Sequence, residues 1–271
     1  MLKMILARIQ QKHRTTTYPD GPPPPLPDRF RGGPVLDTTR CPASCRACAN
    51  ACPTGAICLD NPARLDLGKC LFCTECAEAC PQQAITQGGD YRLSVRQRQD
   101  LLVAPDRRAL TLAAALDDKT KKLFGRSLKL RQVSAGGCNA CEADTNVLNT
   151  VGWDLSRFGI QFVASPRHAD GLLITGPVTR NMELALKKTY DAVAAPKLVI
   201  AVGACAISGG PYLDHDQVNP GAAACVPVDL YIPGCPPHPL TILDGLLRLL
   251  DRLPKTRPLS EKNLTPKRNP S

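Results

Sequence analysis

The residues with the clearest chemistry in this 271-residue chain are its cysteines, and twelve of the fourteen fall into three sets of four. In two sets the last cysteine is followed by proline: Cys41, Cys45, Cys48 and Cys52, and Cys70, Cys73, Cys76 and Cys80. Closely spaced cysteines on one tight loop can wrap three corners of an iron–sulfur cubane, while the fourth is directed at a second cluster. The spacing therefore predicts one [4Fe–4S] cluster on Cys52, Cys70, Cys73 and Cys76, and another on Cys41, Cys45, Cys48 and Cys80.

These two runs are copies of one unit, because Cys45, Cys48 and Cys52 recur 28 residues later as Cys73, Cys76 and Cys80. Such a repeat is typical of a two-fold unit that folds around two clusters. The repeat slips once, since Cys41 lies four residues before Cys45 whereas Cys70 lies three before Cys73. Two interpretations stay open for the Cys41 site: a three-iron cluster, or a four-iron cluster on a bulged loop. Structural zinc also takes four cysteines, but two interleaved sets with a trailing Cys-Pro argue against it.

The third set is spread over the second half of the chain, and each member lies in or beside a Gly/Pro turn. Its members are Cys138, Cys141, Cys205 and Cys235. In an open parallel sheet, the loops after the strands meet at the carboxyl edge of the sheet. We therefore expect these thiols to form a third cluster site rather than to be ordinary core cysteines. Cys58 and Cys225 lack this context and are predicted not to be ligands.

The elements that would position these residues are predicted to alternate between strands and helices in the second half. Strands are expected at 128–133, 160–164, 171–175, 197–202 and 229–232, and helices at 142–150, 182–194 and 238–253. This alternation predicts an α/β fold with a doubly wound, flavodoxin-like parallel sheet over residues 128–253. A small α+β domain over residues 34–90 is expected to precede it.

Three further segments complete the predicted organisation. Residues 1–33 form an arm, with a short basic amphipathic helix within residues 1–20. The tetraproline Pro22–Pro25 must be extended, and we expect it to lie over a neighbouring subunit. Residues 91–127 form a connector with a helix over Leu110–Leu123, and residues 254–271 form a polar tail.

The net charge of +10 is concentrated at the two ends of the chain. Residues 1–40 carry seven Lys or Arg against three Asp, and residues 253–271 carry five against one Glu, so each end contributes +4. Such ends dock on partner subunits or on anionic lipid head groups, and both interpretations stay open. No basic stripe with interleaved aromatics predicts nucleic-acid binding. No apolar run reaches the length of a membrane span or of a secretory signal, so we expect a cytoplasmic protein.

The residues around the third set resemble a known family. The segments GGCNACE (136–142), GACA (203–206) and YIPGCPP (231–237) are similar to the small electron-transfer subunit of membrane-bound [NiFe] hydrogenases of the hydrogenase-4 and formate hydrogenlyase type. The same family includes the 20-kDa subunit of complex I. Residues 34–90 separately resemble a bacterial two-cluster ferredoxin. Two residues, Asn139 and Ala140, separate Cys138 from Cys141, as in the hydrogenase branch, whereas the complex I branch usually has adjacent cysteines. Ala204 and His238 depart from the family, which commonly has an acid and an arginine there.

This resemblance implies an oxidoreductase subunit with three [4Fe–4S] clusters that relays electrons and has no turnover alone. The implied partners are a nickel–iron large subunit, membrane-embedded subunits, and a formate dehydrogenase or ferredoxin-type electron partner. They would attach the chain peripherally to the inner face of the membrane. The alternative is a complex I-like NADH:quinone oxidoreductase subunit that passes electrons to quinone. Glu142 is implied to lie near the third cluster and to face the catalytic partner, or else is a helix-start glutamate favoured by the dipole.

Overall fold

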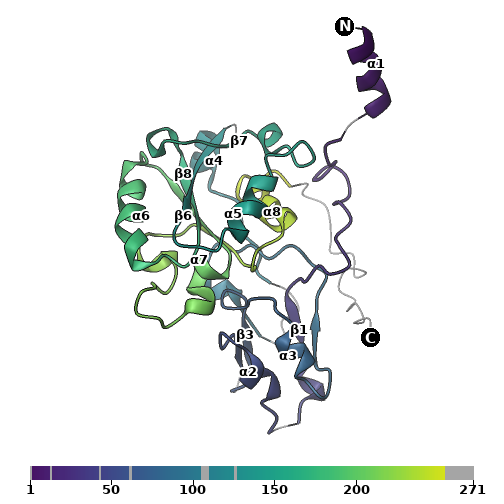
Figure 1. Cartoon of the computed structure of the whole chain (residues 1–271), viewed down its shortest axis with the longest axis vertical. Helices are drawn as coiled ribbons and strands as arrows, with labels where there is room; N and C mark the ends of the chain where they lie inside the picture. The colour runs from purple at the N-terminus through teal and green to yellow at the C-terminus, as the bar shows by residue number, and fades with distance from the viewer. Residues whose placement is uncertain are drawn as a thin grey trace.

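The larger part of the molecule is built on a five-stranded parallel sheet (Figure 1). The computed structural model describes residues 2–12, 14–42, 44–60, 63–104, 110–124 and 127–253. In chain order the strands are β6 (Leu128–Ser134), β7 (Ile160–Phe162), β8 (Gly171–Thr175), β9 (Leu198–Val202) and β10 (Leu230–Ile232). Their spatial order is β10-β9-β8-β6-β7, with every neighbouring pair parallel. This is the order of a flavodoxin-like sheet, so the predicted fold class is confirmed.

Helices cover both faces of this sheet, which explains its apolar strands. Each residue of β8, β9 and β10 is buried, as expected for strands covered on both sides. Leu172 and Ile174 share one core cluster with Leu186 of α6 (Arg180–Ala192) and Ile207 of α7 (Ala204–Ser208). Leu173 belongs to the opposite cluster, with residues of α5 (Ala140–Val147) and α8 (Pro239–Leu249). Alternation along one strand therefore divides the core into two layers.

The cysteine-rich region, residues 34–90, is a smaller α+β unit at the other end of the molecule from α1 (Figure 1). Strand β1 (Pro34–Leu36) pairs antiparallel with β4 (Ile85–Gln87). A three-stranded sheet joins β2 (Ile57–Cys58), β3 (Arg64–Asp66) and β5 (Leu102–Val103). Two short helices, α2 (Ala47–Ala51) and α3 (Glu75–Glu78), carry the middle of each cysteine run. Because β5 lies beyond residue 90, the predicted connector contributes a strand to this unit.

The connector also joins the two units through the edge of the large sheet. Val95 forms an antiparallel bridge with Tyr231 of β10, through backbone hydrogen bonds of 2.9 and 3.0 Å. Arg96 donates to the Asp229 carbonyl at 2.8 Å. Side chains of both units share one hydrophobic core, in which Leu65 of β3 belongs to the same cluster as Ile207 of α7. The cysteine-rich region is therefore held against the sheet by backbone pairing and by apolar burial.

One predicted element of the connector is wrong. The helix expected over Leu110–Leu123 is present only as α4 (Asp118–Phe124). The Asp117 carboxylate accepts hydrogen bonds from the Thr120 backbone N–H at 3.1 Å and from its hydroxyl at 2.7 Å, which starts the helix there. Upstream, the N–H groups of Ala113 and Leu116 donate to Ser94 and Leu249 instead of to their own turn. Tertiary hydrogen bonds thus replace the helical ones, while residues 105–109 and 125–126 lie outside the described residues.

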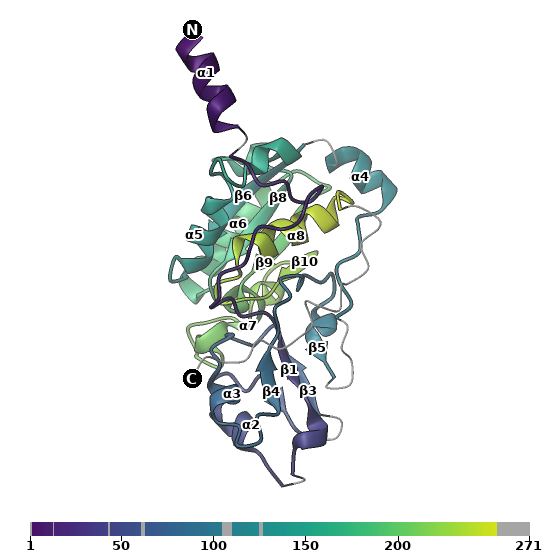
Figure 2. The same cartoon turned by 90° about the vertical axis from the view of Figure 1, so that its right-hand side faces the viewer.

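The N-terminal arm lies along the body of its own chain. Its helix α1 spans Leu2–Gln11, shorter than the predicted limit, and the following segment runs beside α8 (Figure 2). The Tyr18 hydroxyl, buried, donates to Asp244 of α8 at 2.8 Å, and Arg31 donates to the carbonyls of Phe72 and Cys73 at 3.2 and 3.1 Å. These contacts attach the arm to both units. The predicted tail, residues 254–271, lies outside the described residues.

Other predicted helices agree with the structure to within a few residues. The helix expected at 142–150 begins earlier, so Cys141 and Glu142 lie in the first turn of α5. The terminal helix begins at Pro239, where the His238 side chain accepts from the Leu240 N–H at 3.1 Å as an N-cap. Within the described part of the chain, the structure contains no helix that is long and apolar enough to cross a membrane.

Candidate iron-sulfur sites

The third cysteine set comes together at the carboxyl edge of the large sheet. Cys138 follows β6, Cys141 lies in α5, Cys205 lies in α7 directly after β9, and Cys235 follows β10. Burial raises the pKa of Cys141, and negative charge on Cys205, Cys235 and Cys138 raises it further. Cys205, whose pKa burial raises to about 12, interacts with Cys235 and Cys138 in the same way. The structure therefore brings these four thiols together.

Two glycines make room for this set. A Cβ on Gly203, which has φ of +91°, would lie 2.5 Å from the Cys141 sulfur. A Cβ on Gly210, with φ of +59°, would lie 2.7 Å from the Cys205 sulfur. Separations below about 3.0 Å do not occur for real Cβ atoms. Only glycine lets the backbone approach the thiols this closely, and its positive φ also suits glycine.

Glu142 lies beside the third set, because its charge contributes to the raised pKa of both Cys141 and Cys205. The side chain is nearly buried, with 7% exposure. Its Oε1 accepts hydrogen bonds from the Ser134 hydroxyl at 2.6 Å and the Thr175 hydroxyl at 2.7 Å. Hydroxyl donors from β6 and β8 therefore hold the carboxylate at the switch point of the sheet.

The first and second sets are interleaved in space as the spacing predicts. Burial raises the pKa of Cys41, followed by negative charge on Cys80 and Cys45. Cys48 likewise interacts with Cys80 and Cys41. The extra residue before Cys45 therefore does not remove Cys41 from its set.

The second set gathers around Cys70 and Cys76. Burial raises the pKa of Cys70 to about 12, and negative charge on Cys76, Cys52 and Cys73 acts in the same direction. The pKa of Cys76 is raised to about 11, first by burial and then by Cys52 and Cys73. Cys52 thus lies with the later run, and Cys80 lies with the earlier one.

Backbone N–H groups point at three of these sulfurs. Ala56 donates to Cys52, and Ala84 donates to Cys80, both at 3.2 Å and both from four residues further along. The two copies of the repeat thus make the same bond. Phe72 donates to Cys70 at 3.3 Å. Such N–H donors stabilise negative charge on cluster sulfurs and set reduction potentials.

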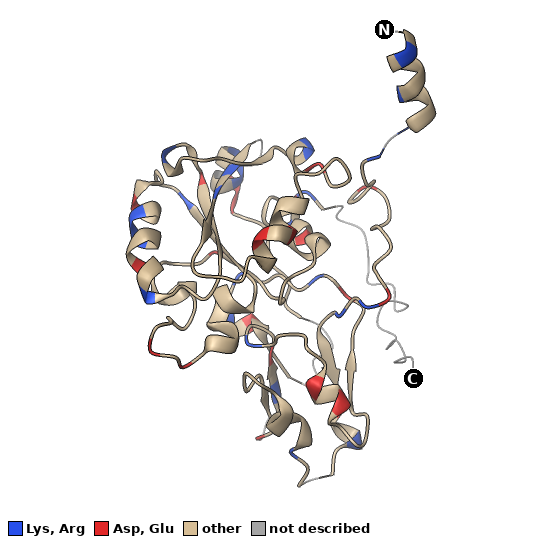
Figure 3. Cartoon of the chain, viewed as in Figure 1, with Lys and Arg blue, Asp and Glu red and all other residues tan. Residues whose placement is uncertain are grey.

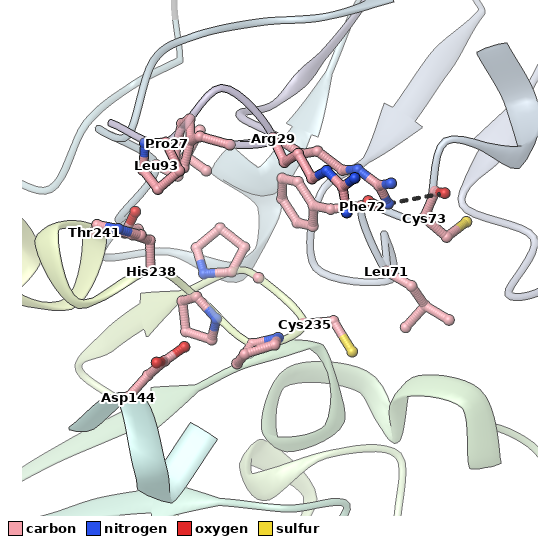
Figure 4. Close-up of a pocket in the computed structure, with 16 residues that line it drawn as sticks. Pro27, Arg29, Leu71, Phe72, Cys73, Leu93, Asp144, Cys235, His238 and Thr241 are labelled. Carbon is pink, nitrogen blue, oxygen red and sulfur yellow. Dashed lines mark hydrogen bonds between the residues drawn. The ribbon is translucent and has the colours of Figure 1, made fainter. Parts of the chain in front are cut away.

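The three sets also lie next to one another. Cys48 of the first set contributes to the raised pKa of Cys76 in the second. Cys73 of the second contributes to that of Cys235 in the third, after burial and Cys138. A cleft of about 600 Å³ lies between the second and third sets and is lined by both Cys73 and Cys235 (Figure 4). The order along the molecule is therefore first, second, third.

The chemistry of the donors fits iron–sulfur clusters. Each set offers four thiols, and burial together with the neighbouring thiolates raises the pKa of several, so gathering four thiolates requires strong positive charge at their centre. Iron in a [4Fe–4S] cluster supplies it and takes four cysteine ligands. No group of three or more His, Cys, Asp or Glu in the described ranges is arranged to hold a single metal ion.

The residues predicted not to be ligands lie apart from the sets. The Cys58 sulfur is 3.5 Å from Asp60, and Cys225 interacts first with Glu183 after burial.

Sequence reasoning missed two residues at the second set. Arg31 holds the Cys73 loop, as described above. Gln87 lines a smaller cavity together with Cys52, Cys70, Cys73 and Cys76. Its Oε1 is buried and, among the described residues, makes no hydrogen bond. No spacing rule links Gln87 to the cysteines, because the pairing of β4 with β1 brings it there.

Two stretches of the chain match known protein families. Residues 138–249 match the family model for the NADH ubiquinone oxidoreductase 20 kDa subunit, and residues 63–86 match that for a 4Fe-4S binding domain. A probable membrane-bound hydrogenase subunit mbhJ from Pyrococcus furiosus is 41% identical over 134 residues, covering 49% of this chain and 80% of that protein. The chain belongs to the 20 kDa subunit family. The resemblance predicted from the cysteine motifs is confirmed, as is 4Fe-4S chemistry in the cysteine-rich region.

Other members of the 20 kDa subunit family come from two kinds of complex. One NADH-quinone oxidoreductase subunit, from Clostridium beijerinckii, is 44% identical over 118 residues, covering 43% of this chain and 70% of that protein. Formate hydrogenlyase subunit 7 from Escherichia coli is 42% identical over 140 residues, covering 52% of this chain and 55% of that protein. The chain is therefore a member of an oxidoreductase family, and both branches expected from the sequence occur among its relatives.

Proposed function

We propose that the chain is the iron–sulfur electron-transfer subunit of a membrane-associated [NiFe] hydrogenase of the formate hydrogenlyase type. The observation that carries this proposal is the contiguous order of three four-thiol sets, in which the charge of Cys48 acts on Cys76 and one cleft is lined by both Cys73 and Cys235. When bound, a [4Fe–4S] cluster supplies a one-electron carrier. The chain contributes the ligands, their order and the burial that limits contact with water.

The assignment of ligands is part of the proposal. Cys41, Cys45, Cys48 and Cys80 would hold the first cluster, Cys52, Cys70, Cys73 and Cys76 the second, and Cys138, Cys141, Cys205 and Cys235 the third. Residues 34–90 and 128–253 would be two domains of one electron-transfer chain. The carboxylate of Glu142, which two hydroxyl groups hold in place, would put a negative charge beside the third cluster.

The third set supplies the face toward a catalytic partner. Cys138 is exposed whereas Cys141 is buried, so the side of this set at Cys138 is open to a docking protein. We propose that this protein is the nickel–iron large subunit and that the chain has no turnover without it. The spacing of Cys138 and Cys141, and the hydrogenase and formate hydrogenlyase relatives, favour this partner over a quinone-linked one.

The remaining partners follow from this assignment. The cysteine-rich region would exchange electrons with a formate dehydrogenase or a ferredoxin-type protein. Membrane-embedded subunits would hold the complex on the inner face of the membrane. The kinship with a membrane-bound hydrogenase and a formate hydrogenlyase supports both features.

The experiment is anaerobic purification of the tagged full chain with its native partners, followed by iron and nickel analysis. Three [4Fe–4S] clusters predict about twelve irons on this chain after partner iron is subtracted. Nickel near one per complex supports the hydrogenase assignment. Full iron without nickel, together with flavin, would replace it with the quinone-linked alternative, and about eight irons would mean that one set holds no cluster.

A further inference from the structure

Helix α1 is an amphipathic surface with no partner in the described part of the molecule. None of its ten residues is buried. Leu2, Ile5, Leu6 and Ile9 are spaced i, i+3, i+4 and i+7, which places them on one stripe of the helix. Their exposed fractions are 71%, 56%, 49% and 66%. A ten-residue helix is marginal in water by itself, so this stripe requires a surface on which to pack.

The charges around the stripe have one sign. Lys3 and Arg8 lie on the two sides of the stripe, and Lys12 and Arg14 follow the helix. The first acidic residue of the chain is Asp20. In Figure 3 the charged positions of α1 are all basic. Basic residues that flank an apolar stripe are the pattern of helices that lie in the interface of an anionic bilayer.

We propose that α1 binds directly to an anionic lipid surface and lies in the plane of its head groups. Ten residues rise about 15 Å as a helix, half of the roughly 30 Å of a hydrocarbon core, so the helix cannot span it. A protein groove would satisfy the apolar stripe but gives no reason for cations on both sides of it. This proposal concerns the arm and does not rest on the assignment of the clusters.

The attachment of the arm gives the contact a direction. Just after α1, the Thr16 N–H donates to the Gly152 carbonyl at 2.8 Å, and Arg157 donates to the Tyr18 carbonyl at 2.6 Å. Val151, in the same loop, is 73% exposed. This end of the molecule lies opposite the cysteine-rich region (Figures 1 and 2). Binding through α1 would therefore keep the cysteine-rich region away from the lipid, where a redox partner can reach it.

The test is co-sedimentation of the anaerobically purified full chain with vesicles of phosphatidylcholine containing about a third phosphatidylglycerol, and with phosphatidylcholine alone. Ile9→Glu places a charge on the stripe, and Met4→Glu makes the same charge change at a position 76% exposed and roughly opposite the stripe. We expect wild-type chain to bind the anionic vesicles, and Ile9→Glu to bind at least about tenfold more weakly. Met4→Glu should bind within about fivefold of wild type, since one charge near the lipid surface contributes about 1 kcal/mol.

Several outcomes would overturn the proposal. One is a wild-type chain that stays in solution with anionic vesicles. The apolar stripe would then pack on a protein rather than on lipid. Another is equal binding by phosphatidylcholine, since the basic residues then have no role. A third is equal weakening by Ile9→Glu and Met4→Glu, which would reduce the effect to net charge. Iron content, measured on each variant, should not change, so failure here is distinguishable from failure of the cluster assignment.

Discussion

Cys73 and Cys235 come from different units of the chain, yet the charge of one affects the other. The pKa of Cys235 is raised first by burial, then by Cys138 and by Cys73. The guanidinium of Arg31 holds the Cys73 loop through two backbone carbonyls, and the Val95–Tyr231 bridge holds the strand that leads to Cys235. The approach of the second and third sets is therefore built into the backbone rather than left to flexible side chains.

Cys235→Ser tests the third set. A serine hydroxyl is a poor ligand for iron compared with a thiolate, so we expect the loss of one cluster and about four irons per chain. Iron analysis and the electron paramagnetic resonance spectrum of the reduced full chain measure this. The control is Cys225→Ser, because Cys225 is a partly buried cysteine that interacts with Glu183 rather than with another cysteine. Equal iron loss in the two variants would contradict the assignment.

Gly203→Ala should impair the third site without altering any ligand. The added Cβ would lie 2.5 Å from the Cys141 sulfur at a backbone φ of +91°, so the thiol must move or the backbone must shift. We expect a large fall in occupancy of the third cluster, with the signals of the other two retained. Gly152→Ala is the control, since a Cβ there meets nothing within 4 Å. Full iron in the Gly203→Ala chain would mean that the glycine does not shape the site.

Tyr18→Phe tests the attachment of the arm. The hydroxyl is buried and donates to Asp244, which Arg248 also contacts at 2.6 Å. A hydrogen bond to a charged group contributes about 1.5–3 kcal/mol, so the melting midpoint should fall by roughly 3–10 °C for a domain of this size. Anaerobic thermal scans at a fixed rate measure it, because cluster loss makes unfolding irreversible. Tyr212→Phe, at a side chain 50% exposed, should change the midpoint by less than about 2 °C.

The grouping of the cysteines could be predicted from their spacing. The two proline-terminated runs predicted that the last cysteine of each, Cys52 and Cys80, joins the other run, and the thiols lie together in those groups. The sheet was predictable from the apolar runs 171–175 and 198–202, whose residues are all buried. The arm and the connector were not, because their conformation depends on tertiary hydrogen bonds such as Tyr18 to Asp244 and Leu116 to Leu249. The local sequence pattern does not predict hydrogen bonds between residues so far apart in the chain.

The position of Gln87 at the second set was likewise not predictable from the local sequence pattern. Strand pairing brings Gln87 to the wall of the cavity at the second set, and its Oε1 is buried without a hydrogen bond among the described residues. A half-turn of the amide places the NH₂ group where the oxygen lies. We predict that a negatively charged cluster held by the second set would favour that orientation, in which Gln87 would donate a hydrogen bond to it.

Gln87→Leu keeps a similar volume and removes the donor. The reduced cluster carries more negative charge than the oxidised one, so it loses more stabilisation, and the reduction potential should fall. A net hydrogen bond of about 1 kcal/mol corresponds to a shift on the order of 40 mV for one electron. Redox titration of the full chain, followed by electron paramagnetic resonance, measures it. Gln97→Leu, at an exposed position of the connector, is the control and should leave all three potentials unchanged. An unchanged or raised potential in Gln87→Leu would show that the amide does not donate to the cluster. A shift in the potential of the third cluster instead of the second would show that Gln87 acts at a different site.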